Sequence, residues 1–415
     1  MEYYPRKIEE KLDEWLKRPE AILIKGPRQS GKTTLLLHLK EKLNGSYVTL
    51  EDEDALKTIE SAPKEFADRY IKNGENVLLI DEAQYCKDVG KKLKLIYDIF
   101  HHKLKLIVTG SGSFDVKVEV GKHLVGRAIY FELLPLNFEE FLMWKAKDLH
   151  KIFLSYKESV KEFVLKGKPI EVKQAFPSEF SSLLHEYITF GGFPAVVKES
   201  DEEIKKELLK NLVRTFIEKD VFFFLGVRHL EKFQSLLKYL SFNNASLIEF
   251  SSIMRELKMD YRTLENYTNL LSATYIITII FSFHKSLSTE LKKARKVYFL
   301  DTGLRNSIIN NFLPLESRTD KGSLLENFVL NELKANFGDN IRYWRTTGKA
   351  EVDFVLTVGE NIIPIEVKSE PKLRKGFLSF LNTYKPDRAL VVTERDFKIQ
   401  KLGKTLTAFI PCFYL

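Results

Sequence analysis

The sequence predicts an α/β protein of several domains, and we expect the first domain to contain a parallel β-sheet. An apolar run at residues 21–24 leads into a glycine-bounded loop, which is followed by a leucine-rich segment with helical character. A second apolar run, at 77–80, ends in two acidic residues. Uninterrupted apolar runs are typical of strands covered on both faces, as in parallel sheets. At 415 residues the chain is too long for one hydrophobic core, so we expect roughly two to four domains.

The composition is that of a soluble globular protein with a basic excess. Hydrophobic residues make up 44% and charged residues 29% of the sequence, and the net charge of +8 favours an anionic partner such as nucleic acid. Cys86 and Cys412 are the only cysteines, which excludes a disulfide framework and a cysteine zinc site. The charged N-terminus does not resemble a signal peptide, and the apolar run at 270–283 is too short to span a bilayer. We therefore expect a cytoplasmic protein without a membrane anchor.

The loop after the first strand has the composition of a phosphate-binding loop. Its backbone N–H groups and the following helix N-terminus can bind phosphate oxygens. Lys32 would contact the β- and γ-phosphates of ATP, and the Thr33 hydroxyl would bind Mg²⁺. The expected nucleotide-binding residues are Gly26, Pro27, Arg28, Gln29, Ser30, Gly31, Lys32, Thr33 and Thr34.

Polar residues end the next buried strands, and the carboxyl ends of parallel strands meet at one edge of the sheet. Asp81 is expected to bind Mg²⁺ and Glu82 to polarise the attacking water. The strand at 104–108 precedes Thr109 and Ser111, which are candidates for a hydrogen bond to that water or to the γ-phosphate. A helix cap or turn explains these two residues equally well.

Arg127 follows a glycine and precedes the apolar run at 128–134. It is a candidate for stabilising transition-state charge on the phosphate, in its own subunit or in a neighbouring one. A surface ion pair is the alternative.

Four segments together resemble the AAA-type ATPases: GPRQSGKTT, VLLIDEAQ, LIVTGSGS and GRAIYFELLPLNFEEFL. The similarity is to the archaeal and bacterial branch whose C-terminal region was long catalogued as a domain of unknown function. It implies an AAA-type P-loop ATPase core over residues 1–147 that hydrolyses ATP with Mg²⁺. It leaves open whether the protein forms a homo-oligomer or binds a protein partner.

A helical lid or linker region is expected at 148–230. The lysine-rich stretch 148–173 is interpreted as an insertion or an exposed helical hairpin, and 178–197 and 202–224 as helices. The sequence GGFP at 191–194 falls in this region and is interpreted mainly as a structural turn.

Residues 231–318 resemble a winged helix-turn-helix. Helices are expected at 233–240 and 249–257, a third is capped by Asp260, and strands follow at 275–283 and 296–300. In that fold the third helix can enter the major groove of DNA, where Tyr261, Arg262 and Asn266 would face the bases. The phosphate contacts would come from Lys285, Lys292, Lys293, Arg295 and Lys296. Glu265 on the same helix argues against tight sequence-specific binding, and a packing module is the alternative.

The last segment, 319–415, brings acidic residues together on a predicted hairpin. Strands at 351–358 and 361–368 flank a turn at 359–360, and symmetric closure places Asp353 opposite Glu366, with Lys368 on the same face. Facing carboxylates repel each other, and a divalent cation compensates for this repulsion. A register slip of one residue would separate the two acids.

This arrangement resembles the PD-(D/E)xK nuclease fold, a restriction-endonuclease-like α/β domain. The resemblance implies that Asp353 and Glu366 bind Mg²⁺ or Mn²⁺, that Glu326 on the preceding helix assists, and that Lys368 helps to position water and stabilises the phosphate. Val352 stands where the motif usually has proline. The function expected is therefore an ATPase with a nuclease-like domain that acts on DNA. The alternative is a non-nucleolytic ATP-driven switch, or a DNA- or protein-binding regulator whose C-terminal domain is catalytically inactive.

Overall fold

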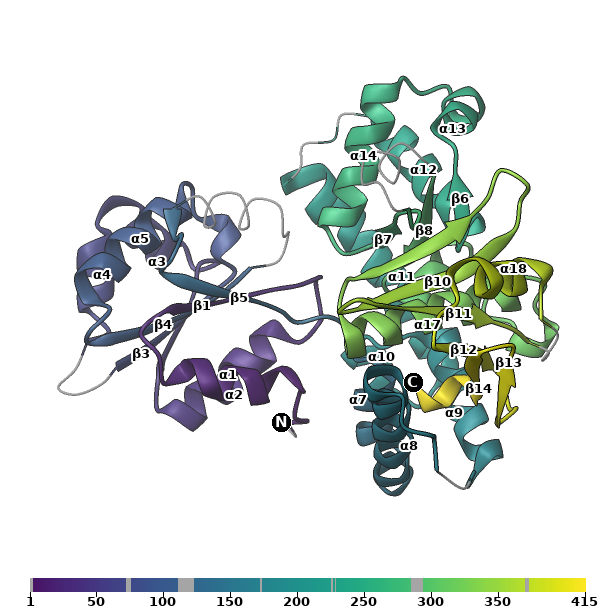
Figure 1. Ribbon diagram of the computed structural model, residues 1–415. Helices are drawn as coiled ribbons and strands as arrows, with labels where there is room; N and C mark the ends of the chain where they lie inside the picture. The colour runs from purple at the N-terminus through teal and green to yellow at the C-terminus, as the bar shows by residue number, and fades with distance from the viewer. Residues whose placement is uncertain are drawn as a thin grey trace.

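The chain folds into two lobes that lie side by side in the computed structural model (Figure 1). The structure describes residues 3–71, 76–110, 123–171, 174–224, 227, 229–284, 294–369 and 373–415. The first lobe, purple to blue in Figure 1, contains the elements up to residue 132, and the second lobe contains those from residue 138 onwards.

The first lobe is a parallel sheet with helices on both faces. Its five strands have the order β2-β3-β4-β1-β5, and every pairing is parallel. The strands are β1 (Ala21–Lys25), β2 (Ser46–Thr49), β3 (Asn76–Asp81), β4 (Leu104–Gly110) and β5 (Ala128–Glu132). The helices are α1 (Ile8–Leu16), α2 (Lys32–Leu43), α3 (Glu53–Ser61), α4 (Pro63–Asp68), the short η1 (Ala83–Tyr85) and α5 (Val89–Phe100).

The alternation of buried strand residues explains these layers. Ile22 and Ile24 of β1 pack against α1 and α2, whereas Ala21 and Leu23 pack in the cluster that contains α3, α4 and α5. A strand that is buried on both faces needs apolar residues at every position, which accounts for the uninterrupted apolar runs. The predicted parallel α/β core is confirmed.

Helices begin the second lobe: α7 (Phe138–Lys145), α8 (Lys147–Lys166), α9 (Pro177–Phe190), α10 (Pro194–Lys198), α11 (Glu202–Thr215) and the π-helix η2 (Phe216–Phe224). The prediction of an exposed helical hairpin at 148–173 is wrong, because α8 is a single packed helix, and the alternative of an insertion stays a prediction. Phe153 and Phe163 are fully buried, and the Tyr156 ring stacks on Tyr414 with centroids 4.1 Å apart. The first domain is expected to extend to residue 147. Phe138 and Phe141 of α7 nevertheless belong to this same core of the second lobe.

The helix predicted at 178–197 is interrupted at the glycine pair. Gly191 has a φ of +77°, and a Cβ atom there would lie 2.2 Å from a carboxylate oxygen of Asp301. That carboxylate accepts hydrogen bonds from the backbone N–H groups of Gly192 (2.7 Å) and Leu304 (2.8 Å). Glycine is therefore required on steric grounds at this turn.

The predicted helices and strands of the middle region are present. They are α12 (Leu230–Phe242), α13 (Phe250–Leu257), α14 (Tyr261–Ala273), β7 (Ile277–Ile280) and β8 (Arg295–Phe299). A further short strand, β6 (Ser246–Ile248), completes an antiparallel sheet with the order β6-β8-β7. The short helices α16 (Thr302–Ile308) and η3 (Leu315–Ser317) follow.

The C-terminal segment forms a mixed sheet with the order β13-β14-β12-β11-β10-β9. Its strands are β9 (Ile341–Arg345), β10 (Glu351–Val358), β11 (Asn361–Val367), β12 (Arg388–Thr393), β13 (Lys398–Leu402) and β14 (Thr405–Pro411). The helices are α17 (Lys321–Phe337), α18 (Lys375–Tyr384) and the short η4 (Cys412–Tyr414). α17 packs in one hydrophobic cluster and α18 in another, on opposite faces of the sheet.

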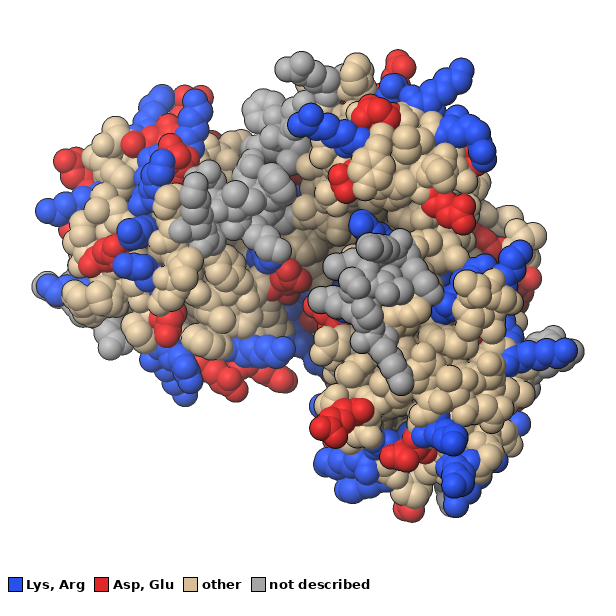
Figure 2. Space-filling model, turned by 45° about the horizontal axis from the view of Figure 1, so that its top comes forward, with Lys and Arg blue, Asp and Glu red and all other residues tan. Residues whose placement is uncertain are grey.

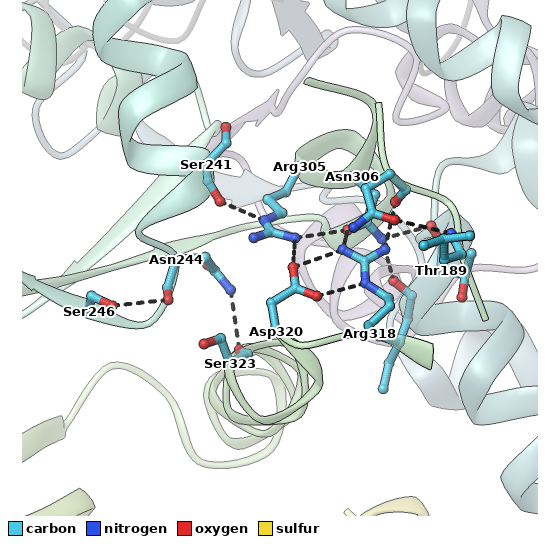
Figure 3. Close-up of polar contacts among 12 residues, drawn as sticks. Thr189, Ser241, Asn244, Ser246, Arg305, Asn306, Arg318, Asp320 and Ser323 are labelled. Atoms are coloured by element: carbon cyan, nitrogen blue, oxygen red, sulfur yellow. Dashed lines mark hydrogen bonds and ion pairs between the residues drawn. The ribbon is translucent and has the colours of Figure 1, made fainter. Parts of the chain in front are cut away.

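A buried polar cluster joins the helices of the second lobe (Figure 3). The Arg305 guanidinium donates to the Ser241 carbonyl (2.7 Å) and forms an ion pair with Asp320. Asp320 also pairs with Arg318 (2.8 Å), whose Nη2 donates to the Asn306 side chain (3.0 Å). This cluster connects α12, α16 and the start of α17.

Candidate functional site

Asp81 is the centre of the polar cluster at the carboxyl edge of the first sheet. Its carboxylate is 1% exposed and accepts hydrogen bonds from Thr33 Oγ1 (2.7 Å), the Tyr47 hydroxyl (3.0 Å) and Thr109 Oγ1. β4 lies between β1 and β3, so the loop after β1 and the ends of β3 and β4 meet at one edge. The structure therefore brings the predicted residues Thr33, Asp81 and Thr109 together. The side-chain oxygens of Thr33 and Asp81 are of the type that Mg²⁺ prefers as ligands.

Lys32 lies inside the loop that precedes it. Its ammonium donates to the carbonyls of Gly26 (3.0 Å) and Pro27 (2.7 Å), and the residue is only 4% exposed. Burial lowers the pKa of Lys32 to about 8, although the nearby Glu82 and Asp81 carboxylates oppose this shift. Phosphate oxygens of a nucleotide would supply the countercharge that this buried cation needs.

The backbone of the loop is shaped for close approach of a ligand. Gly31 has a φ of +99° and is the N-cap of α2. Because glycine has no side chain that could accept hydrogen bonds from the first N–H groups of the helix, it does not compete with a ligand for them. A Cβ on Gly26 would lie 2.1 Å from the Leu133 carbonyl, which excludes any other residue there. Ser30 Oγ is buried and has no hydrogen-bond partner among the described residues.

Glu82 follows Asp81 in a left-handed conformation with a φ of +53°. Its carboxylate accepts a hydrogen bond from the Gln84 amide, which orients it at the edge of the site. The role of Glu82 in polarising water stays a prediction. Ser111 lies outside the described residues.

Arg127 is far from the phosphate loop of its own chain. It precedes β5, which runs parallel to β1, so it lies at the amino edge of the sheet, whereas the loop follows the carboxyl edge. Five residues of strand separate the two edges, a distance of about 16 Å at roughly 3.3 Å per residue. The Arg127 guanidinium pairs with Asp98 (2.6 Å). The prediction of a role within its own subunit is wrong, and the ion-pair alternative is what the structure contains.

Two interactions at the loop were missed by the sequence analysis. Arg6 donates to the Ser30 carbonyl (2.9 Å) and forms a buried pair with Glu140 of α7 (2.9 Å). Arg28 pairs with Asp220 of η2 (2.9 Å). Both acids are more than a hundred residues away in sequence, so no local pattern reveals these contacts.

A second cluster of charged residues lies on the β10–β11 hairpin. The pairing runs from Phe354–Ile365 to Val358–Asn361, and one further step places Asp353 opposite Glu366. The predicted register is confirmed. Lys368 Nζ lies 3.0 Å from Glu366 Oε1.

The residue Arg374, which the sequence analysis missed, lies between the two acids. Its guanidinium is 3.3 Å from Asp353 Oδ1 and 3.7 Å from Glu366 Oε1. Burial and the Asp353 charge raise the pKa of Glu366 to about 7. Among the described residues, no three acidic, histidine or cysteine side chains form a metal-binding group. A cation at Asp353 and Glu366 would therefore need water or phosphate oxygens as further ligands.

Glu326 and Lys296 form the other side of this cluster. Glu326 Oε1 accepts from the Tyr298 hydroxyl (2.6 Å) and from Lys296 Nζ (3.0 Å), and the Lys296 ammonium also lies 2.6 Å from Glu351. Lys296 is 3% exposed. Its predicted contact with a DNA phosphate is therefore wrong, because two partly buried acids, Glu326 and Glu351, hold it inside the protein. Burial and the charge of Asp353 raise the pKa of Glu326, although Lys296 opposes this shift.

The other predicted DNA-contact residues are distributed as follows. Tyr261, Arg262 and Asn266 are exposed on α14. The Arg295 guanidinium lies over the ring of Phe281, 5.4 Å from its centroid. Lys285, Lys292 and Lys293 are outside the described residues. On the face shown in Figure 2, basic and acidic side chains are interspersed on both lobes.

The sheet topology and the Lys32–Thr33–Asp81 arrangement define the first lobe as a P-loop nucleotide-binding domain. Residues 18–142 match the family described as AAA domain, so the chain contains an AAA domain. Residues 181–315 and 321–414 match two families, each described as a domain of unknown function (DUF8612 and DUF4143). The AAA match and the site together support an ATP-binding ATPase.

Similar proteins come from archaea and bacteria. Uncharacterized protein MJ1544 of Methanocaldococcus jannaschii is 29% identical and covers 92% of this chain and 79% of its own length. An uncharacterized protein of Haemophilus influenzae is 24% identical, with 92% and 88% covered. Among solved structures, the Aeropyrum pernix ORC2 protein in its ADP form is 11% identical, with 73% of this chain and 90% of that chain covered and a TM-score of 0.34.

No described helix combines the length and the apolar character that crossing a membrane would require.

Proposed function

We propose that the first lobe hydrolyses ATP in a Mg²⁺-dependent reaction. The observation that carries this proposal is the direct contact of Thr33 and Thr109 with Asp81, next to the buried Lys32. Lys32 would bind the phosphates, and Thr33 and Asp81 would hold Mg²⁺, which supplies charge neutralisation when bound. Glu82 would orient the attacking water, and Thr109 would keep the Asp81 carboxylate in place.

Phosphate release from ATP tests this proposal. Lys32→Ala is expected to lower the rate to background, and Glu82→Gln is expected to abolish turnover while nucleotide binding is retained. Lys42→Ala is the matched control, because Lys42 lies on the same helix in an exposed ion pair with Asp13. Equal rates for the wild type and Lys32→Ala would refute the proposal.

We further propose that the second lobe acts on DNA. The facing acids Asp353 and Glu366, with Lys368 beside Glu366, have the composition of a phosphodiester-cleaving site. The hairpin register and the 3.0 Å contact of Lys368 support this candidate. The helix and strand order from α12 to β8 supports a winged helix-turn-helix whose exposed residues on α14 would contact DNA. This proposal keeps the expected division at 148–230, 231–318 and 319–415.

Cleavage assays separate this enzyme from the alternative, an ATP-driven switch with an inactive C-terminal domain. Supercoiled, linear, branched and single-stranded DNA are incubated with Mg²⁺ or Mn²⁺. We expect cleavage that Asp353→Asn and Lys368→Ala abolish, whereas Asp339→Asn, an 85% exposed site in the same domain, retains it. The absence of cleavage on all substrates would favour the switch.

A further inference from the structure

The two lobes share little apolar contact. In the described residues, the hydrophobic clusters that pack against the first sheet contain only residues of the first lobe and of the segment after β5. The two largest of the other hydrophobic clusters lie in the second lobe. Domains joined in this way are expected to move relative to each other. Individual polar contacts across the joint therefore have a large influence on how the lobes are coupled.

One of these contacts ends directly in the phosphate loop. Arg28 Nε lies 2.9 Å from both carboxylate oxygens of Asp220, and the two side chains are 14% and 6% exposed. Asp220 belongs to η2, the nine-residue π-helix that continues α11. π-Helical turns are rare and are often found at functional sites.

Asp220 also lies within electrostatic range of the nucleotide-binding lysine. Its charge raises the pKa of Lys32 and so opposes the effect of burial there. Pro27, Arg28 and Asp220 line a small cavity together with Phe193 and Phe216. The second lobe thus places a carboxylate in contact with Arg28 and within electrostatic range of Lys32, two loop cations that phosphate oxygens would also contact.

We propose that Arg28 and Asp220 form a latch between the lobes, which the phosphates of a bound nucleoside triphosphate release. Phosphate oxygens and the Asp220 carboxylate compete for the same cations, so nucleotide binding weakens the Arg28–Asp220 pair. Release allows η2 to move. Because η2 continues α11, and α11 contacts α16, this movement reaches the rest of the second lobe. The latch rests on the proposed nucleotide site and adds the means by which its occupancy reaches the second lobe.

Thermodynamic linkage makes the proposal testable, because a contact that nucleotide weakens must in turn weaken nucleotide binding by the same factor. The affinity for a fluorescent non-hydrolysable ATP analogue with Mg²⁺ is measured by anisotropy. Asp220→Asn is expected to bind about tenfold more tightly than the wild type. Glu218→Gln is the matched control, because Glu218 lies on the same π-helix in an exposed pair with Arg214, and its affinity should equal that of the wild type.

A double-mutant cycle assigns the effect to the pair. In the Arg28→Gln background, Asp220→Asn should change the affinity much less than it does in the wild-type background. An equal or weaker affinity of Asp220→Asn relative to the wild type would overturn the latch. If Asp220→Asn does not fold, hydrogen exchange of residues 216–224 in the wild type decides: faster exchange with the analogue supports the latch, and unchanged or slower exchange refutes it.

Failure of the latch is distinguishable from failure of the nucleotide site. If the wild type binds the analogue and Lys32→Ala does not, while Asp220→Asn matches the wild type, only the latch is refuted. If neither the wild type nor Lys32→Ala binds the analogue, both the nucleotide site and the latch are refuted.

Discussion

Replacement of Asp320 by asparagine tests the buried cluster that joins the helices of the second lobe. Asp320 is the shared anion of Arg305 and Arg318, whose side chains are 2% and 0% exposed, whereas its own side chain is 22% exposed. Removing the anion leaves two buried cations without their countercharge, and breaking a buried pair typically costs about 3–5 kcal/mol. Because Asp320 is partly exposed, we expect a loss of about 3 kcal/mol in the free energy of unfolding at pH 7.

The pH dependence gives a sharper test. Hydrogen bonds from Arg318 and Arg305 lower the pKa of Asp320 from 3.8 to about 2, against the opposing effect of burial. The full shift corresponds to roughly 2 kcal/mol, which solvent screening reduces to about 1–2 kcal/mol. Because the pKa in the folded state is lower than in the unfolded state, this stabilisation is complete above the unfolded-state value and is lost as the pH falls from about 4 towards 2.

Urea denaturation followed by tryptophan fluorescence is a suitable assay, because Trp144 and Trp344 report on the second lobe. The difference between the wild type and Asp320→Asn should shrink as the pH falls from 6 to 3. The exposed Asp339→Asn serves as the control and should show little difference at either pH. A difference that stays constant over this range would refute the assignment of the shifted pKa to Asp320.

Three further predictions follow from single contacts. Lys296→Ala removes the buried cation that pairs with Glu326 and Glu351. It should lower the free energy of unfolding by about 3 kcal/mol, measured by urea denaturation. Arg127→Ala should leave the ATPase rate per chain unchanged in a phosphate-release assay under monomeric conditions, because Arg127 lies at the other edge of the sheet. Gly191→Ala should destabilise the protein by more than about 2 kcal/mol in thermal unfolding, and Gly338→Ala by about 1 kcal/mol. Both glycines have a positive φ, but only at Gly191 would the added Cβ atom also clash with a carboxylate, that of Asp301. Equal losses at the two glycines would contradict the steric argument.

The sequence predicted those parts of the sites that follow from local geometry. The parallel sheet follows from runs such as 77–80, and parallel strands place Asp81 at the same edge of the sheet as the loop that contains Thr33. The opposition of Asp353 and Glu366 follows from a two-residue turn, because the turn sets the register of the whole hairpin. In the hairpin, the spacing along the chain determines which side chains face each other, whereas in the first sheet the strand direction determines the edge at which the polar side chains lie.

The remaining contacts depended on packing between distant segments. Periodicity indicates that a helix such as α8 has an apolar face, but it does not identify the surface that covers this face. The sequence therefore predicts an insertion or an exposed helical hairpin at 148–173, where the structure contains a packed helix. The same limit applies to Lys296, which belongs to a basic stretch in the sequence but lies among acids from α17 and β10 in the structure.

The sequence by itself thus determined the α/β core, the residues of the phosphate loop and the facing acids of the hairpin. Only the tertiary structure decided that Arg28 meets Asp220, that Lys296 is buried and that Arg127 is remote from the loop. The physical reason is that local sequence sets backbone conformation and the face on which a side chain lies. The partner of a charged side chain, in contrast, is set by which distant elements pack together, and the cost of burying an unpaired charge then selects the ion pairs that form.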